Sequence, residues 1–263
     1  MQPSRCPWLA FGAGAADAGV RLLCLPFAGG GASAYLGWRR HLPGVAVAPL
    51  QYPGHETRLS ERPLVSLDAM LAGLADAVAP WLDRPYALFG CSLGARLAFA
   101  LVRQLAERGL PPPCGLLVAA SAPPGRPAVA DTAGLDDGAF QRLVRSYGGI
   151  PPELDADPGF WTMALPVLRA DFALAAQPLP GPGPGPGPGH PLDCPVVAYA
   201  GRDDTLATPL AMAGWSAMTT GGSRLHCFDG GHFFLQSAPD FLDTLSADID
   251  RLRLGAAACL VPA

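Results

Sequence analysis

Six short apolar runs along the chain have the pattern of buried β-strands. They are continuously apolar rather than alternating, which is typical of strands covered on both faces in a parallel sheet. The runs lie at 21–25 (RLLCL), 45–50 (VAVAPL), 86–89 (YALF), 115–120 (GLLVAA), 195–200 (PVVAYA) and 223–228 (SRLHCF). Segments with helical periodicity separate them at 67–82, 93–108, 207–218 and 239–252. This alternation predicts an α/β fold with a mostly parallel, doubly wound sheet.

The alternation stops between about 123 and 190. Two segments there, 136–147 and 157–176, have the pattern of helices, and no strand-like run separates them. The tract PGPGPGPGPG at 180–189 suits neither a helix nor a central strand, so we expect a solvated linker. We therefore predict a single domain over 1–263, with a core at about 20–122 and 191–254. A helical lid is expected to be inserted at about 123–190 and to end in the Pro-Gly linker.

The composition argues against several classes of function. The 263 residues are 50% hydrophobic and carry a net charge of −4, and all 18 basic residues are arginines. Without lysine there is no Schiff-base chemistry and no lysine-dependent phosphate loop. Because the chain has no basic run, we expect neither nucleic-acid nor membrane binding. It also has no leader pattern and no long apolar run, and its seven cysteines are odd in number, so we expect a cytoplasmic protein with free thiols.

The run GCSLG at 90–94 is the strongest candidate for chemistry. A chain of this composition holds roughly 0.16 G-x-S-x-G patterns by chance, so the pattern alone is weak evidence. The position of the pattern strengthens this evidence, because GCSLG follows a predicted strand and opens a predicted helix, as in a nucleophile elbow. Ser92 would then occupy a strained turn, where a side chain at 90 or 94 would collide with the neighbouring strand and helix. We predict Ser92 as the nucleophile and expect its rival, Cys91, to face away from the cavity.

Two backbone amides are candidates for stabilising an oxyanion beside Ser92. Leu93 starts the predicted helix, whose free N–H groups point at the same place. The loop after the first strand, PFAGGGAS at 26–33, should supply the second donor, with Ala28 preferred to Phe27. Its glycines lack the G-x-G-x-x-G spacing of a nucleotide site, and we expect no cofactor and no metal.

A histidine downstream of Ser92 should act as the general base. His190 lies in the Pro-Gly tract, where it cannot be held rigidly, and His226 falls within a predicted strand. His232 follows the turn DGG just after that strand and is the predicted base. His55 precedes the serine, which is the wrong chain order, and is expected as a loop residue near the cavity.

The expected acid follows the strand at 195–200. The sequence Gly201-Arg202-Asp203-Asp204 places two carboxylates where one can orient the imidazole, and Asp204 is favoured over Asp203 without excluding it. In the lid, Asp171 lies on an otherwise apolar stripe and is expected in the chamber, at the surface or in a cap-type role. Apolar lid residues are expected to form a wall of the chamber, namely Phe160, Trp161, Met163, Leu165 and Phe172.

Taken together, these stretches resemble the stand-alone type II thioesterases of polyketide and non-ribosomal peptide assembly lines, in the α/β-hydrolase superfamily. The similar blocks are LLCLPFAGGGASAYLGW, YPGHETR, LFGCSLGARLAF, LPVLRADF, YAGRDD and FDGGHFFL, between about 21 and 238. The resemblance implies an α/β-hydrolase fold with Ser92, Asp204 and His232 as the catalytic triad. Two features depart from the family: Cys91 stands where a histidine is usual, and the Pro-Gly tract replaces an ordinary connection.

The resemblance also implies a function and partners. Such a hydrolase removes aberrant or stalled acyl groups from the phosphopantetheine arm of acyl or peptidyl carrier domains, and we expect a monomer. A general carboxylesterase or acyltransferase acting on small soluble substrates would share the triad and is the first alternative. The second is a non-catalytic carrier-binding protein, because a fold does not determine a function.

Overall fold

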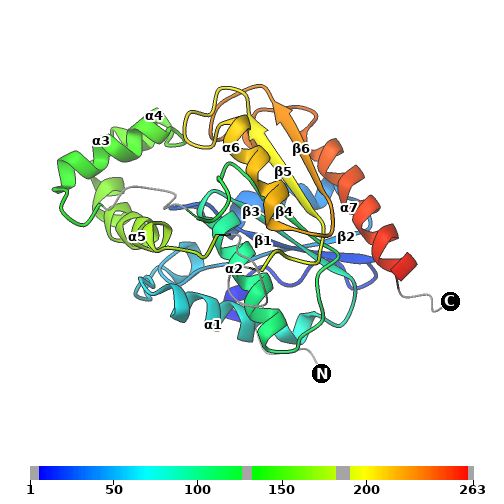
Figure 1. The fold of residues 1–263 in the computed structure, drawn as a ribbon. Helices are drawn as coiled ribbons and strands as arrows, with labels where there is room; N and C mark the ends of the chain where they lie inside the picture. The colour runs from blue at the N-terminus through cyan, green and yellow to red at the C-terminus, as the bar shows by residue number, and fades with distance from the viewer. Residues whose placement is uncertain (1–5, 126–131, 182–189, 260–263) are drawn as a thin grey trace.

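A six-stranded parallel sheet forms the centre of the computed structural model, which describes residues 6–125, 132–181 and 190–259 (Figure 1). Its strands run in the order β2-β1-β3-β4-β5-β6, and every neighbouring pair is parallel. They are β1 (Val20–Leu25), β2 (Val45–Pro49), β3 (Tyr86–Cys91), β4 (Gly115–Ala119), β5 (Val196–Gly201) and β6 (Ser223–Phe228). All six predicted strands are confirmed, with ends shifted by at most two residues.

Both faces of the sheet are covered, which explains why the strand sequences are continuously apolar. Leu23 and Leu25 of β1 pack with α1, α2 and α6 on one face. Leu22 and Cys24 point the other way and pack with η2 and α7. The helices are α1 (Leu67–Val78), α2 (Leu93–Glu107), α6 (Pro209–Ala213) and α7 (Phe241–Cys259), with the 3₁₀ helix η2 (Ala32–Arg40). The doubly wound α/β architecture is therefore confirmed.

One predicted helix differs from the structure. The segment 207–218 forms the short helix α6 followed by the 3₁₀ helix η5 (Gly214–Met218). Thr208 caps the N-terminus of α6 by accepting a hydrogen bond from the Ala211 N–H at 3.2 Å. Pro209 at the first helical position suits such a start, but Gly214 favours termination after little more than one turn.

Between β4 and β5, the described residues form three helices that lie at the opposite end of the molecule from α7 (Figure 1). They are α3 (Asp137–Tyr147), α4 (Pro152–Asp155) and α5 (Pro158–Ala176). Helices α3 and α5 share a small apolar core of their own, formed by Phe140, Val144, Trp161, Leu168 and Phe172. Most of the expected Pro-Gly linker, 182–189, lies outside the described residues. The division into a core at 20–122 and 191–254 and a lid at 123–190 stays a prediction.

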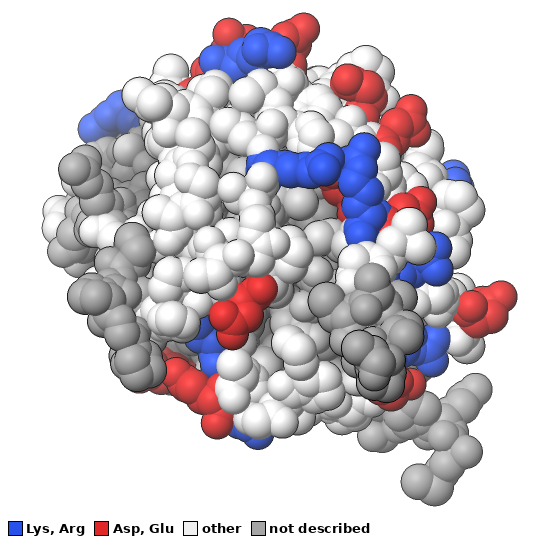
Figure 2. Space-filling model, turned by 45° about the vertical axis from the view of Figure 1, so that its right-hand side comes forward, with Lys and Arg blue, Asp and Glu red and all other residues white. Residues whose placement is uncertain are grey.

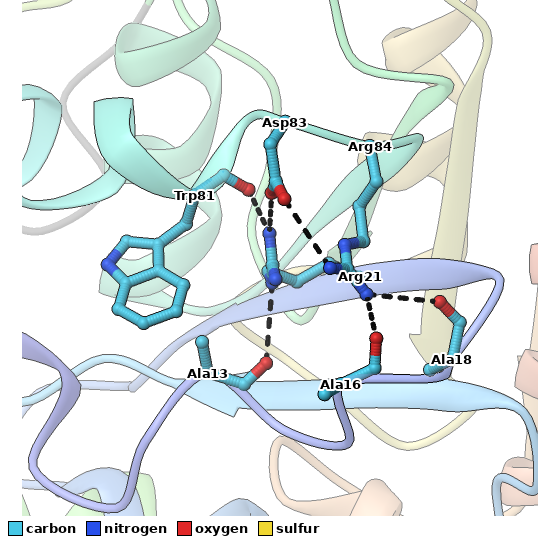
Figure 3. A network of polar contacts seen from close by, with 7 residues as sticks. All are labelled: Ala13, Ala16, Ala18, Arg21, Trp81, Asp83 and Arg84. Carbon is cyan, nitrogen blue, oxygen red and sulfur yellow. Dashed lines mark hydrogen bonds and ion pairs between the residues drawn. The ribbon is translucent and has the colours of Figure 1, made fainter. Parts of the chain in front are cut away.

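A buried arginine ties the N-terminal segment to the start of the sheet (Figure 3). Arg21 of β1 is 3% exposed and donates hydrogen bonds to the carbonyl oxygens of Ala13 and Trp81. It also pairs with Asp83, its Nη1 lying 2.9 Å from the carboxylate Oδ1. The neighbouring Arg84 donates to two further carbonyl oxygens, those of Ala16 and Ala18. Because one guanidinium donates to several groups at once, it connects chain segments that are not joined by the hydrogen bonds of a β-sheet.

Charges on the surface are mixed. On the face drawn in Figure 2, arginines lie close to acidic side chains, and much of that face is uncharged. Two arginines of α7 pair with aspartates three residues earlier, Arg251 with Asp248 and Arg253 with Asp250. Within the described ranges, no helix is both long enough and apolar enough to cross a membrane.

We expect replacement of Arg21 by leucine to lower the free energy of unfolding by about 2 to 3 kcal/mol, because buried carbonyl oxygens then lose a charged donor. Urea unfolding of the wild type and of Arg21→Leu measures this difference. Arg62 is exposed, so Arg62→Leu serves as the matched control and should stay within about 0.5 kcal/mol of the wild type. Equal stability of the two variants would contradict a structural role for this network.

Candidate active site

The site lies where the order of the strands reverses. Strand β1 has β2 on one side and β3 on the other, so the connections that follow β1 and β3 leave the sheet side by side. Such a switch point at the carboxyl ends of parallel strands creates a crevice. Ser92 follows β3, and the loop 26–33, hereafter the glycine loop, follows β1. Leu25 is paired with Gly90, so both segments begin at the same level.

Ser92 occupies the sharp turn between β3 and α2. Its φ of 53° lies in the left-handed region, where a residue with a side chain is strained. Both flanking glycines are sterically required: a Cβ on Gly90 would overlap the backbone of Gly94, and a Cβ on Gly94 would overlap the backbone of Leu25 and Pro26. The expected collisions at 90 and 94 are therefore confirmed, and this tight turn presents the Ser92 hydroxyl beyond the sheet edge.

Ser92, His232 and Asp204 lie in one hydrogen-bonded row. The Nε2 atom of His232 is 3.0 Å from Ser92 Oγ, and its Nδ1 atom is 2.9 Å from Asp204 Oδ2. Because a carboxylate only accepts, Nδ1 carries the proton, and the Nε2 lone pair faces the serine hydroxyl. The histidine side chain is 11% exposed and the aspartate side chain is fully buried, so water has little access to the row.

The turn after β5 holds Asp204 as an ionised group. Its Oδ1 accepts hydrogen bonds from the N–H groups of Leu206 at 2.8 Å and Ala207 at 3.0 Å. Burial alone would raise the pKa of Asp204, but the hydrogen bonds from His232 and these amides outweigh burial, and the net pKa lies below the usual 3.8. Asp203 is exposed, so the structure brings Asp204 rather than Asp203 to the imidazole.

The other candidates for base and nucleophile lie elsewhere. His226 is stacked on Tyr199 and its Nε2 is 3.0 Å from Asp248, far from Ser92 in the fold, while His190 is exposed. Cys91 is fully buried in the core that packs against α7. Burial raises the pKa of its thiol, so the group stays protonated and unreactive.

Two backbone amides of interest have no protein acceptor. Leu93 is the first residue of α2, and Ala28 lies in the glycine loop and lines the cavity beside Ser92. In the part of the chain that the structure describes, neither N–H is hydrogen-bonded to another residue. Three other loop amides are occupied: Gly29 donates to Asp171, Ala32 to Gln51, and the next residue, Ser33, to a carboxylate. The N–H of Phe27, the alternative to Ala28, also has no acceptor among the described residues.

A cavity of about 640 Å³ opens above Ser92, a size typical of small-ligand sites. It is lined by residues that follow all six strands, including Ala28, His55, Ser92, Ala120, Leu206 and His232. The three helices between β4 and β5 complete its wall. Of the five apolar side chains expected there, Phe160, Met163 and Phe172 line the cavity, whereas Trp161 and Leu165 do not. The described residues hold no cluster of three or more His, Cys, Asp or Glu that could bind a metal.

Aromatic residues around His232 were not found by sequence reasoning. Phe233 packs edge-on against Phe27 of the glycine loop, with ring centroids 5.1 Å apart. Tyr147, the last residue of α3, lies with its ring centroid 6.3 Å from that of His232. Tyr147 and Phe233 both line the cavity, and their separation along the chain left no sequence signal.

Asp171 and His55 form a second pair beside the cavity. Asp171 is 1% exposed and does not line the cavity, so a place in the chamber or at the surface was wrong, whereas it does accept a backbone N–H, that of Gly29. It binds His55 instead, with Oδ2 3.0 Å from Nε2. His55 does line the cavity, near which it was expected.

Comparisons with known proteins agree with this architecture. Residues 20–249 match the family described as thioesterase domain. The gramicidin S biosynthesis protein GrsT of Aneurinibacillus migulanus is 32% identical over 218 residues, which are 82% of this chain and 83% of GrsT. The similarity extends over most of both proteins.

Two solved structures are similar in fold and in sequence. RedJ, a thioesterase from the prodiginine pathway of Streptomyces coelicolor, superposes with a TM-score of 0.80 at 36% identity, covering 88% of this chain and 86% of RedJ. The type II thioesterase BorB, from the borrelidin biosynthetic cluster, has a TM-score of 0.78 at 33% identity, covering 92% of this chain and 96% of BorB. These similarities confirm the expected α/β-hydrolase fold.

We expect the substitution Gly94→Ala to destabilise the protein by about 3 kcal/mol or more, because the added methyl group meets backbone atoms that cannot move aside. Urea unfolding measures the effect. The control is Gly255→Ala in α7, where a Cβ meets nothing within 4 Å. There alanine should stabilise by up to about 1 kcal/mol through helix propensity. If both substitutions stabilised equally, the tight approach at the turn would be refuted.

Proposed function

Because this chain belongs to the thioesterase domain family, we propose that it is a type II thioesterase that hydrolyses stalled or aberrant acyl groups from the phosphopantetheine arms of carrier domains in polyketide or non-ribosomal peptide biosynthesis. The observation that carries this proposal is the hydrogen-bonded row of Ser92, His232 and Asp204 at the base of a largely apolar cavity. Two relatives support this proposal: GrsT is named for gramicidin S biosynthesis, and BorB is named as a type II thioesterase from the borrelidin biosynthetic cluster.

The proposed reaction begins with formation of an acyl-enzyme. His232 takes the proton of Ser92 while Oγ attacks the carbonyl carbon of the thioester. The C–S bond then breaks, and the imidazolium gives its proton to the leaving pantetheine sulfur, which departs as a thiol. Asp204 accepts the Nδ1 hydrogen throughout and stabilises the imidazolium, while itself staying ionised.

Hydrolysis completes the cycle. A water molecule loses a proton to His232 and attacks the ester carbon of acyl-Ser92. The bond from that carbon to Oγ breaks, the serine regains its proton from the imidazolium, and the free carboxylic acid leaves. Both steps pass through a tetrahedral oxyanion, for which the N–H groups of Ala28 and Leu93 are the proposed donors, because neither is otherwise engaged within the described residues.

The cavity and its rim suit an acyl group that is delivered on an arm. Leu59, Leu154, Met163 and Leu206 line the cavity and are between 44% and 59% exposed. Apolar groups exposed together around an opening are typical of interaction sites. We infer that the acyl chain occupies the interior, while the arm enters past this rim and the carrier domain stays outside.

We expect Asp204→Asn to lower kcat by about 10³- to 10⁴-fold, because the amide stabilises the wrong imidazole tautomer. Asp203→Asn is the matched control, since its side chain is the exposed neighbour, and its kcat should remain within about twofold of the wild type. Steady-state hydrolysis of an acyl-N-acetylcysteamine thioester measures both. Full turnover by Asp204→Asn would remove Asp204 from the proposed triad.

The substrate is tested with carrier domains loaded with acetyl, propionyl and longer acyl-pantetheine groups. Mass spectrometry should show loss of the acyl mass with the wild-type protein and none with Ser92→Ala. We expect carrier-bound thioesters to be cleaved more than about tenfold faster, in kcat/KM, than the matching acyl-coenzyme A, because carrier contacts add binding energy.

Two other outcomes would replace this proposal. If the carriers stay loaded while simple esters are cleaved, the protein is a general esterase and the assembly-line substrate is wrong. If the carriers bind but neither thioesters nor esters are cleaved, and a fluorophosphonate fails to label Ser92, the protein is a binding module.

A further inference from the structure

Asp171 is a buried carboxylate that the proposed reaction does not use. It lies on helix α5 and is 1% exposed. A buried carboxylate is stable only when donors compensate its charge. Both donors come from other parts of the chain: its Oδ2 accepts a hydrogen bond from the Gly29 N–H at 2.7 Å and lies 3.0 Å from His55 Nε2.

His55 lies between two oxygen atoms, and this arrangement favours its cationic form. Its Nδ1 is 3.1 Å from the carbonyl oxygen of Pro53, and its Nε2 faces Asp171. When Asp171 is ionised neither oxygen can donate, so both ring nitrogens then carry protons. Burial alone would lower the pKa of His55, but the hydrogen bond to Asp171 and the charge of that carboxylate outweigh it, and the net pKa lies above 6.5. The pair is thus a buried ion pair.

The carboxylate holds one peptide group of the glycine loop in a defined orientation. The Gly30 N–H donates to the Phe27 carbonyl oxygen at 2.9 Å, which closes a four-residue turn. Gly29, third in this turn, has a φ of +74°, as in a type II turn. Type I and type II turns differ by rotation of the central peptide, here the one between Ala28 and Gly29. Its N–H is the group that Asp171 binds.

Helix α5 also packs directly on this turn. A Cβ at Gly29 would lie 2.6 Å from the Leu168 side chain, which is one helical turn before Asp171. At the start of the loop, Tyr52 donates a hydrogen bond to the Pro26 carbonyl oxygen at 3.2 Å. Ala28 therefore lies between an anchor on the core and an anchor on α5.

We propose that Asp171, supported by His55, is a positioning residue that holds the Ala28 N–H in place for the oxyanion from helix α5. The inference rests on the proposed function, because it needs Ser92 to form a tetrahedral adduct. Without the acceptor at Asp171, the central peptide of the turn can rotate, which changes ψ of Ala28 and the direction of its carbonyl oxygen. The segment that carries the Ala28 N–H then loses one of its two anchors. The position of the Ala28 N–H therefore depends on the contact between Gly29 and Asp171 of α5.

The test compares Asp171→Leu, which removes the acceptor, with Asp171→Asn, whose amide oxygen can still accept from Gly29. Arg169→Ala is the control, because Arg169 lies on the same helix but pairs with Asp137 of α3. With an acyl-N-acetylcysteamine thioester, we expect Asp171→Leu to lower kcat about 10- to 100-fold, less than or comparable to loss of an oxyanion donor. Its KM should change little, and Asp171→Asn should restore most of the activity.

A second measurement separates positioning from general structural damage. An acyl trifluoromethyl ketone forms an oxyanion adduct with Ser92, whereas the matching thioether binds without reaction. We expect Asp171→Leu to lower the affinity for the ketone by the same factor as it lowers kcat/KM, and to leave the affinity for the thioether unchanged. Arg169→Ala should change neither affinity.

Equal weakening of ketone and thioether, or wild-type kcat in Asp171→Leu, would overturn the proposal. If Asp171→Leu does not fold, His55→Gln gives the same comparison, because it removes the imidazole that supports Asp171. We then expect a smaller loss of affinity for the ketone and none for the thioether. The absence of this selective loss would count against the proposal. Failure of the proposed function is distinguishable, because the wild type would then cleave no thioester and bind the ketone no better than the thioether.

Discussion

The site depends on the close approach between the first turn of α2 and the end of β1. Gly94 has no room for a Cβ because the backbone of Leu25 and Pro26 lies against it. The parallel pairing of β1 and β3 sets this distance, since it brings Leu25 level with Gly90. As a result, backbone packing brings Ser92 and the start of the glycine loop together, while the side chains of Tyr52 and Asp171 hold the loop itself.

Two histidine–carboxylate pairs flank the cavity, and their surroundings give them different chemical states. Asp204 receives two backbone N–H groups from its own turn, and His232 beyond it faces a hydroxyl that can both donate and accept. His55, by contrast, lies between the carboxylate of Asp171 and a carbonyl oxygen, and both favour its doubly protonated form. The first histidine can take a proton, whereas the second is already charged. The same pair of residue types thus suits proton transfer in one place and anchoring in the other.

Local patterns predicted much of the fold, because they report burial directly. Strands covered on both faces need continuous apolar runs, and all six were found in this way. The nine-residue 3₁₀ helix η2 was missed, since it is held by Tyr35 and Trp38 packing into the core rather than by a helical period. The helix expected at 207–218 was too long because a proline and a glycine limit α6 to five residues.

For the site, order and spacing along the chain were enough to select residues that the fold brings together. The sequence-based preference for Asp204 over Asp203 depended on turn geometry, which only the structure displays. The contact between Asp171 and His55 spans 116 residues and depends on how α5 docks against the core. No local pattern encodes such docking, which explains why Asp171 was expected in the chamber or at the surface.

The anchor of Gly29 on α5 has a consequence for recombining parts of related enzymes. The helices between β4 and β5 look like an interchangeable cover, because they have a small core of their own and line the substrate cavity. A chimera that exchanges them would nevertheless also exchange the acceptor that orients the glycine loop, 142 residues earlier in the chain. Substrate range and catalytic rate are therefore inherited together, and a graft that is to change only the range must keep Asp171 and its partner His55 as a matched set.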